Sequence, residues 1–195
     1  LLMTLGTGIG TSDEDALSRL VRICSFALHS YNPEQVIYFC SEESKGSIEP
    51  VHAALADKYG MSPPSFSVCM LPDPNDFTGC FEVLYGVASL YHDEEVVIEA
   101  STGTREMITA AEIVSFLTRS PVSHISGEKS GGIIIPGTER IREMVLFAAY
   151  DRLQLHRAIY AFNHNHFGSS LRLLSGIRGL PERDVYYSLF NAYWH

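Results

Sequence analysis

The sequence lacks the motifs of several common enzyme classes. It has no Gly-Lys-Ser/Thr phosphate loop, no Ser, His and Asp in a triad order, and no Cys/His cluster with metal-ligand spacing. No apolar run approaches the ~20 residues that a membrane span needs. These absences argue against a P-loop NTPase, a serine hydrolase, a metal centre and a membrane protein. We therefore expect no metal ligand and no membrane partner, and the sequence assigns no catalytic residue.

Basic residues are also scarce. The chain has 14 Lys and Arg against 23 Asp and Glu, a net charge of −9, and residues 1–138 hold 7 basic and 18 acidic residues. An acidic first part argues against a long nucleic-acid groove, because such grooves need many Lys and Arg contacts to phosphate. A small phosphorylated ligand is compatible with this charge, because helix N-termini bind phosphate with few basic side chains.

The cysteines and the start of the chain give information on the cellular compartment of the protein. Cys24, Cys40, Cys69 and Cys80 lie in apolar runs without metal-type spacing. We expect buried, reduced thiols and a cytoplasmic protein. The apolar start lacks a basic region and a cleavage signal, so it predicts a strand and not a signal peptide. The two ends have the appearance of cuts through a longer chain.

The first 138 residues alternate strand and helix patterns. This order predicts an α/β fold, a Rossmann-like and mostly parallel sheet with helices on both faces. From Glu139 helical spacing replaces the strand signals, so we expect a Rossmann domain at 1–138 and an all-helical, truncated region at 139–195. The strands are expected at 1–5, 35–41, 65–71, 95–100, 123–126 and 132–135, and the helices at 13–31, 47–59, 77–91 and 105–118.

Two strand ends are followed by loops of small residues. One loop begins at Gly6-Thr7-Gly8-Ile9-Gly10, and the other is Ser101-Thr102-Gly103-Thr104. Where a strand leads through a loop of small residues into a helix, free backbone N–H groups point toward one place. Such an arrangement favours the binding of an anion. Arg105 in the first helical turn opposes the helix dipole, so a bound anion explains it better than helix stability does. Because ligands of parallel sheets sit at the carboxyl ends of the strands, the two loops predict one shared phosphate site.

Each motif has a simpler explanation. The first loop fits a structural turn or a dinucleotide fingerprint, but its spacing is GxGxG and Glu42 lies 32 residues past Gly10, against the usual ~20. The second loop fits a plain helix cap. His164-Asn165-His166 predicts a polar turn, because positions i and i+2 do not share a helix face. Arg157 and His164 have the Arg-x6-His spacing of one class of helical ribonucleases, which is common by chance.

The motifs resemble those of a known family. Ser101 to Met107 resembles the Thr-Gly-Gly-Thr-Lys-x-Met signature of the CRISPR-associated Rossmann-fold (CARF) sensor domains, with Thr102 in place of the first Gly of the doublet and Arg105 in place of the Lys. Leu5 to Gly8 resembles their first loop, and residues 124–127 and 132–139 are similar to their final strands. The tail is similar to the helical linker of the family's type III effector proteins.

The resemblance implies a homodimer whose two-fold axis passes through one site for a cyclic oligoadenylate, a ligand and not a cofactor. The first loop and Gly103–Arg105 are expected to hold phosphate or ribose, and Ser41, Glu42 and loop 72–77 to reach the bases. The residues implied to bind the ligand are Gly6, Thr7, Gly8, Ile9, Gly10, Ser41, Glu42, Asp76, Ser101, Thr102, Gly103, Thr104, Arg105 and Met107.

The family also implies an output. Ligand binding would shift the dimer and pass through the helical region to an antiviral effector domain outside these 195 residues. The sequence leaves three alternatives: a ring nuclease that cleaves the ligand in the same pocket, a nicotinamide-dependent oxidoreductase, and a transcription regulator built on the same sensor.

Overall fold

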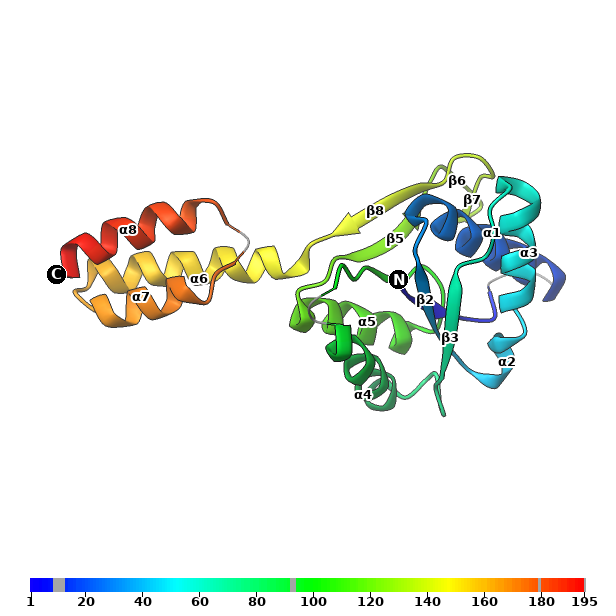
Figure 1. Ribbon diagram of the computed structural model, residues 1–195, viewed down its shortest axis with the longest axis horizontal. Helices are drawn as coiled ribbons and strands as arrows, with labels where there is room; N and C mark the ends of the chain where they lie inside the picture. The colour runs from blue at the N-terminus through cyan, green and yellow to red at the C-terminus, as the bar shows by residue number, and fades with distance from the viewer. Residues whose placement is uncertain (9–12, 92–93, 179, 195) are drawn as a thin grey trace. The chain divides into compact units, whose positions relative to one another are not determined.

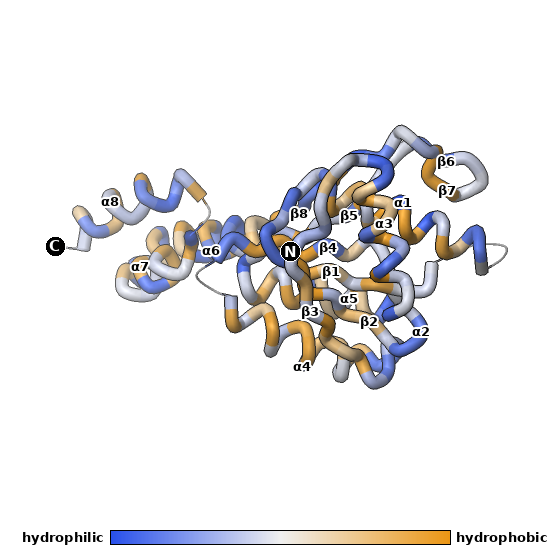
Figure 2. Tube along the Cα trace, turned by 45° about the vertical axis from the view of Figure 1, so that its right-hand side comes forward, coloured by the Kyte–Doolittle hydropathy of each residue, from blue (hydrophilic) through white to orange (hydrophobic). Residues whose placement is uncertain are grey.

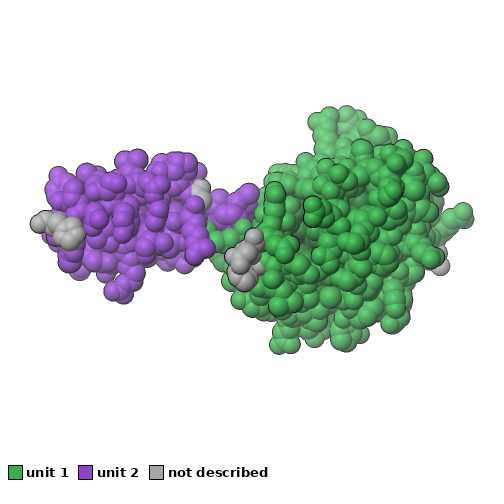
Figure 3. Space-filling view, in the orientation of Figure 1, with its two compact units in different colours: residues 1–144 green, residues 145–195 purple. Residues whose placement is uncertain are grey.

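The computed structural model describes residues 1–8, 13–91, 94–178 and 180–194, without the side chain of Asp13. The chain divides into two compact units, Leu1–Met144 and Val145–His195 (Figure 3). Unit 1 contains the mixed α/β part of the chain, and unit 2 contains only helices in its described residues.

A six-stranded sheet forms the centre of unit 1, in the order β3-β2-β1-β4-β5-β8. The first five strands along the chain are parallel to their neighbours, and β8 pairs antiparallel with β5. After β1 the chain builds β2 and β3 on one side, and it then returns to build β4 and β5 on the other. The strand order therefore switches between β1 and β4. The strands are β1 (Leu2–Leu5), β2 (Gln35–Cys40), β3 (Ser65–Met70), β4 (Ile98–Glu99), β5 (Val122–Ser126) and β8 (Arg140–Met144).

Helices cover both faces of the sheet. Figure 1 shows α1 and α3 on one side, and α4 and α5 on the other. Shorter elements connect them, including a hairpin of β6 and β7 that is separate from the main sheet. The longer helices are α1 (Asp13–Tyr31), α3 (Ile48–Tyr59), α4 (Phe77–Ala88) and α5 (Arg105–Thr118); the shorter elements are α2 (Glu42–Lys45), the 3-10 turn η1 (Ser89–Tyr91), β6 (Lys129–Ser130) and β7 (Ile133–Ile134).

The core lies between the sheet and these helices. Met3 and Leu5 on β1 are fully buried, as are Val36 and Tyr38 on β2, and they pack under the apolar stripe of α1 around Leu20. Apolar colour runs along the central strands and along α4 in Figure 2. Each such side chain contributes about 1.5–3 kcal/mol when it leaves water. This packing fixes the sheet and with it the positions of the strand ends.

The fold class is the one that the sequence predicts, with local differences. The helix expected from Glu139 is wrong at its start, because residues 140–144 form the edge strand β8 and the compact unit continues to Met144. Ile141 and Met144 have helical spacing, but their backbone pairs with β5. The strand expected at 132–135 is present only as β7 in the separate hairpin. The single-turn helix α2 was not expected.

Unit 2 consists of α6 (Leu146–Asn163), α7 (Phe167–Ser175) and α8 (Glu182–Trp194). Its core contains Leu155, Leu174 and Phe190, and the Phe190 ring stacks on Phe162 at 3.9 Å between centroids. As predicted, the two histidines at 164 and 166 lie in the turn between α6 and α7.

The described part of the chain contains no helix long and apolar enough to cross a membrane. Its four cysteines are free thiols, and all except the half-buried Cys69 are buried. Burial raises the pKa of the Cys24 thiol to about 12, helped by the nearby Glu99 carboxyl. A thiol in this environment is protonated and unreactive at neutral pH.

Phe190→Ala tests the core of unit 2. We expect the free energy of unfolding of this unit to fall by about 3–5 kcal/mol, because the change removes one ring of the stacked Phe162–Phe190 pair and leaves a cavity beside the other. Hydrogen exchange of peptides within α6, α7 and α8 measures the effect. Val185→Ala on the same helix is the control, since Val185 is 69% exposed. An equal effect of both variants would contradict the assigned core.

Candidate functional site

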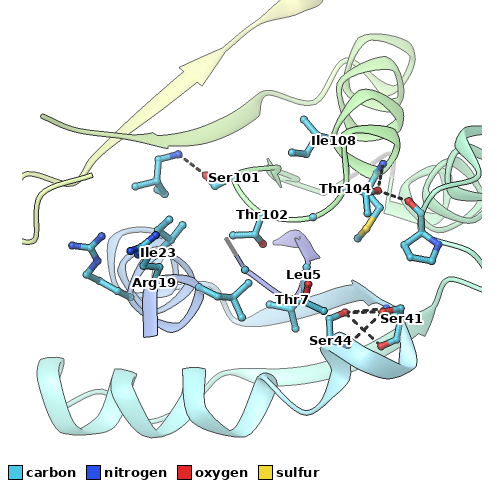
Figure 4. Close-up of a pocket in the computed structure, with 18 of the residues that line it drawn as sticks. Leu5, Thr7, Arg19, Ile23, Ser41, Ser44, Ser101, Thr102, Thr104 and Ile108 are labelled. Atoms are coloured by element: carbon cyan, nitrogen blue, oxygen red, sulfur yellow. Dashed lines mark hydrogen bonds between the residues drawn. The ribbon is translucent and has the colours of Figure 1, made fainter. Parts of the chain in front are cut away.

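A cavity of about 560 Å³ lies at the carboxyl ends of β1 and β4, where the strand order switches. This is the place where open α/β sheets bind their ligands, and the volume falls in the ~300–1,000 Å³ range of small-molecule sites. Figure 4 shows its walls: the loops after β1 and β4, the middle of α1, the short helix α2 and the N-terminus of α5. The loop before α4 and the β6–β7 hairpin complete the lining.

The two predicted loops meet on the floor of this cavity. A Cβ at Gly6 would lie 2.7 Å from both the Cα and the backbone N of Gly103, closer than packed atoms approach. Gly103 itself has φ +120°, which L side chains rarely adopt. The contact therefore requires glycine at both positions. It brings the backbones of two loops that are almost 100 residues apart into direct contact.

Hydrogen bonds between two threonines lock this contact. The Thr102 hydroxyl donates to the Thr4 carbonyl at 2.6 Å, and the Thr4 hydroxyl donates to the Thr102 carbonyl. The side chain that replaces the family's glycine therefore bonds to β1, with the Cys24 sulfur 3.9 Å from its oxygen. Thr102 strengthens the junction of the two loops.

The N-terminus of α5 opens onto the cavity. Thr104 is its N-cap: its hydroxyl accepts from the Met107 N–H at 3.2 Å and donates to the Pro74 carbonyl (Figure 4). The first turn of a helix has N–H groups without intrahelical partners, and the helix dipole places partial positive charge there. The helix start therefore offers donors for an anion, while Thr104 ties the loop before α4 to the same wall.

The buried carboxyl of Glu99 holds the second loop, Ser101–Thr104, by a hydrogen bond. Glu99 on β4 is 2% exposed, and its Oε1 accepts from the Ser101 N–H at 2.8 Å. Burial raises the pKa of Glu99, while the bonded Ser101, the neighbouring Ser123 hydroxyl and the charge of His124 act in the opposite direction. The Ser101 hydroxyl in turn accepts from the Ile125 N–H at 2.5 Å, so this residue is held by two strands.

Cationic side chains from two other elements line the cavity. Arg19 and Arg22 come from α1, and Lys129 comes from the β6–β7 hairpin. Arg22 donates to the Ile134 carbonyl at 2.7 Å, and its Nη1 lies 3.3 Å from Oε1 of Glu139. Arg22 therefore fastens the hairpin to α1 at the mouth of the site. These residues were not among those predicted, although the i, i+3 spacing of Arg19 and Arg22 on a helix that follows a glycine loop was an available signal.

Most of the predicted ligand residues line this cavity together. Glu42 does not line it, whereas its neighbours on the short α2, the exposed Glu43 and the buried Ser44, do. Asp76 instead caps α4, accepting from the Thr78 and Gly79 N–H groups. Ile9 and Gly10 lie outside the described residues. The predicted residues that line the cavity are Gly6, Thr7, Gly8, Ser41, Ser101, Thr102, Gly103, Thr104 and Met107.

Arg105, the first residue of α5, is exposed beside the cavity and does not line it. Within residues 1–8, 13–91, 94–178 and 180–194 it forms no ion pair, so no protein carboxylate compensates its unfavourable place at a helix start.

The chemistry offered by the site is anion binding by backbone N–H groups, hydroxyls and a few cations. The described residues hold no group of three His, Cys, Asp or Glu that could bind a metal. In unit 2, His164 stacks on Tyr160 at 4.0 Å, and its Nδ1 lies 2.8 Å from the Tyr160 carbonyl oxygen. These contacts give His164 a structural role at the end of α6.

Fold and site together define a Rossmann-like domain with an anion site at its switch point, followed by a helical unit. Residues 150–195 match the family model of the Csm6 6H domain. The chain also shares its fold with Csm6 from Enterococcus italicus, solved bound to cyclic hexa-2'-fluoro-hexa-dAMP, over 97% of its length with a TM-score of 0.70 and 9% identity. It covers 53% of that chain, and thus spans about half the length of that Csm6.

Can2 from Sulfobacillus thermosulfidooxidans, solved in complex with cyclic tetra-adenylate (cA4), aligns with 64% of this chain and 31% of its own, at 10% identity and a TM-score of 0.49. No curated protein sequence matches the chain. The 6H match and the shared Csm6 fold confirm the resemblance inferred from the sequence. Residues 150–195 thus match a Csm6-type helical domain, and the chain as a whole has the fold of that Csm6.

Gly6→Ala tests the contact between the loops. Because its Cβ would collide with the Gly103 backbone, we expect unit 1 to lose about 1–3 kcal/mol of unfolding free energy. Gly46→Ala is the matched control, since a Cβ there meets nothing within 4 Å, and we expect a change within about 0.5 kcal/mol. Urea denaturation measures both. If Gly6→Ala is as stable as the control, the loops do not meet as described.

Proposed function

We propose that this chain is the cyclic oligoadenylate-binding sensor of a CRISPR-associated antiviral effector. The observation that carries the proposal is the junction of Gly6 with Gly103 at the switch point, which joins two anion-accepting loops into one floor. The fold shared with a Csm6 solved bound to a cyclic hexa-adenylate analogue supports the same ligand class. A ring of nucleotides carries one phosphate per unit, and backbone donors at a helix start suit such charges.

The ring is shared by two chains in this proposal. A cavity of about 560 Å³ in one chain accommodates part of a ring of several nucleotides. A two-fold ring on the axis of a homodimer meets the same loops twice, which doubles the donors around it. Binding would then bias the dimer toward one arrangement and signal through the helical unit to an output domain outside these residues.

The first experiment is a calorimetric titration with cyclic tetra-adenylate, cyclic hexa-adenylate and NAD, with the mass of the protein measured by light scattering. We expect a dimer that binds one ring per two chains and does not bind NAD. Tight binding of NAD without a response to either ring would replace the proposal with a dinucleotide site. A monomer that binds one ring per chain would contradict the shared site. Analysis of the titrated ligand separates a sensor from a ring nuclease, because only the nuclease yields linear products.

Arg105→Ala tests the cation beside the cavity. Its long exposed side chain can reach a ligand that extends beyond the cavity of one chain. Loss of a charged hydrogen bond to phosphate is expected to weaken ring binding about ten- to hundredfold. The melting temperature should stay unchanged or rise, because a cation leaves the positive end of a helix. Arg152→Ala on α6, also exposed, is the control for a lost charge. Unchanged affinity together with a lower melting temperature would make Arg105 structural.

A further inference from the structure

A row of polar side chains crosses the sheet beneath the site. In the register of the sheet, Glu99 on β4 pairs with Ser123 on β5, and Ser123 pairs with Glu143 on β8. Residues paired in this way lie on the same face of a sheet. Tyr31, the last residue of α1, reaches the outer end of the row, where its hydroxyl donates to Oε1 of Glu143 at 2.9 Å.

The inner end of the row holds the ligand loop. Glu99 Oε1 accepts from the Ser101 N–H at 2.8 Å, and Ser101 lines the cavity. Ser123 is the common neighbour in the middle, because its hydroxyl affects the pKa of Glu99 and also the pKa of Tyr31. The row therefore leads from a loop of the site to the edge strand β8. Along the chain, β8 is followed directly by α6.

Two atoms in the middle of the row are not satisfied. Within the described residues, Glu99 Oε2 and the Ser123 hydroxyl oxygen have no hydrogen-bond partner, although Glu99 is 2% exposed and Ser123 is fully buried. A buried polar atom without a partner is unfavourable and calls for an explanation. The row is hydrogen-bonded at its two ends, by Glu99 to Ser101 and by Tyr31 to Glu143, but not at Ser123 in its centre. A small displacement of the loop or of β8 would let these two atoms form the bonds that they lack.

We propose that Glu99 is a positioning residue for the ligand loop and that the row Glu99–Ser123–Tyr31–Glu143 couples the occupancy of the site to β8. This inference rests on the proposed function for its ligand, but the coupling itself is a property of the free protein. When an anion pulls on the Ser101–Thr104 loop, the Glu99 carboxyl follows the Ser101 N–H. The Ser123 hydroxyl, which has no partner in the free protein, then bonds to Glu99 or to Tyr31, and this changes the bond of Tyr31 to Glu143 on β8.

The competing explanation is that these residues only stabilise the sheet. In that case, substitutions would lower stability locally and independently of one another. A coupled row predicts effects at a distance that depend on the intermediate residue. Two substitutions distinguish these cases. Glu99→Gln retains an acceptor for the Ser101 N–H but loses the charge, and Tyr31→Phe removes only the hydroxyl between Ser123 and Glu143.

The first experiment uses the 195-residue chain without ligand and follows amide hydrogen exchange at 101–104 and at 140–144. We expect Glu99→Leu, which removes the acceptor, to speed exchange in the loop about tenfold, and Glu99→Gln to restore most of the protection. Glu99→Leu should also change exchange in β8, and this remote effect should vanish in the Tyr31→Phe background. If Glu99→Leu does not fold, Glu99→Gln is compared in the same two backgrounds. Unchanged loop exchange, or a remote effect that persists in Tyr31→Phe, would overturn the proposal.

The second experiment adds cyclic tetra-adenylate or cyclic hexa-adenylate. We expect the ring to change exchange at 140–144 in the wild type and in Ser30→Ala, the control for a lost hydroxyl on an exposed position next to Tyr31. In Tyr31→Phe the affinity should stay within about twofold, since Tyr31 does not line the cavity, while the response of β8 is lost. A full response in Tyr31→Phe would refute the coupling. Failure of every ring to bind would refute the proposed function, and the ligand-free experiment would still decide on the row.

Discussion

The structure depends on one steric constraint, the close passage of two loops where the strand order switches. β1 and β4 are parallel neighbours, so their carboxyl ends emerge side by side and the chain must leave in opposite directions. There is room for this only because Gly6 has no Cβ opposite the Gly103 backbone. The two Thr4–Thr102 hydrogen bonds hold the passage closed. The loops after β1 and β4, which form the floor of the cavity, are placed by this contact.

The same constraint explains how an acidic domain offers a site for anions. The first 138 residues carry far more carboxylates than cations, but a distant surface charge is screened by salt within about 8 Å at physiological ionic strength. Backbone N–H groups at a helix start act at hydrogen-bond distance and are fixed by the fold. Burial raises the pKa of Glu99, the carboxyl that bonds the loop from β4. Local donors and not net charge decide what the cavity attracts.

The sequence reveals the parts of this molecule that depend on local patterns. Helices such as 13–31 and 105–118 were predicted to their observed ends, because apolar periodicity, the proline after Asn32 and a capping threonine mark them. The two loops were found because small residues follow strand runs. The spacing of Arg19 and Arg22 places them on one helix face, but no local pattern shows that this face meets the hairpin, since that depends on the Arg22 bond to the Ile134 carbonyl, 112 residues further along. That Glu43 and not Glu42 lines the cavity depends on α2, and this helix of a single turn is too short to leave a periodic pattern in the sequence.

The edge strand β8 shows why a local pattern can mislead and what that implies for the architecture. Its sequence, Arg140 to Met144, alternates poorly and is rich in charge, as expected for an edge strand that must not pair with other chains. With apolar residues at 141 and 144, it also fits the start of a helix. A domain that ended at Thr138 would leave the long edge of β5 unpaired, from Val122 to Ser126, although Val122 and Ser123 are fully buried in the chain. The sheet is complete only with β8, so the segment that closes the Rossmann-like unit is also the one from which the helical unit begins.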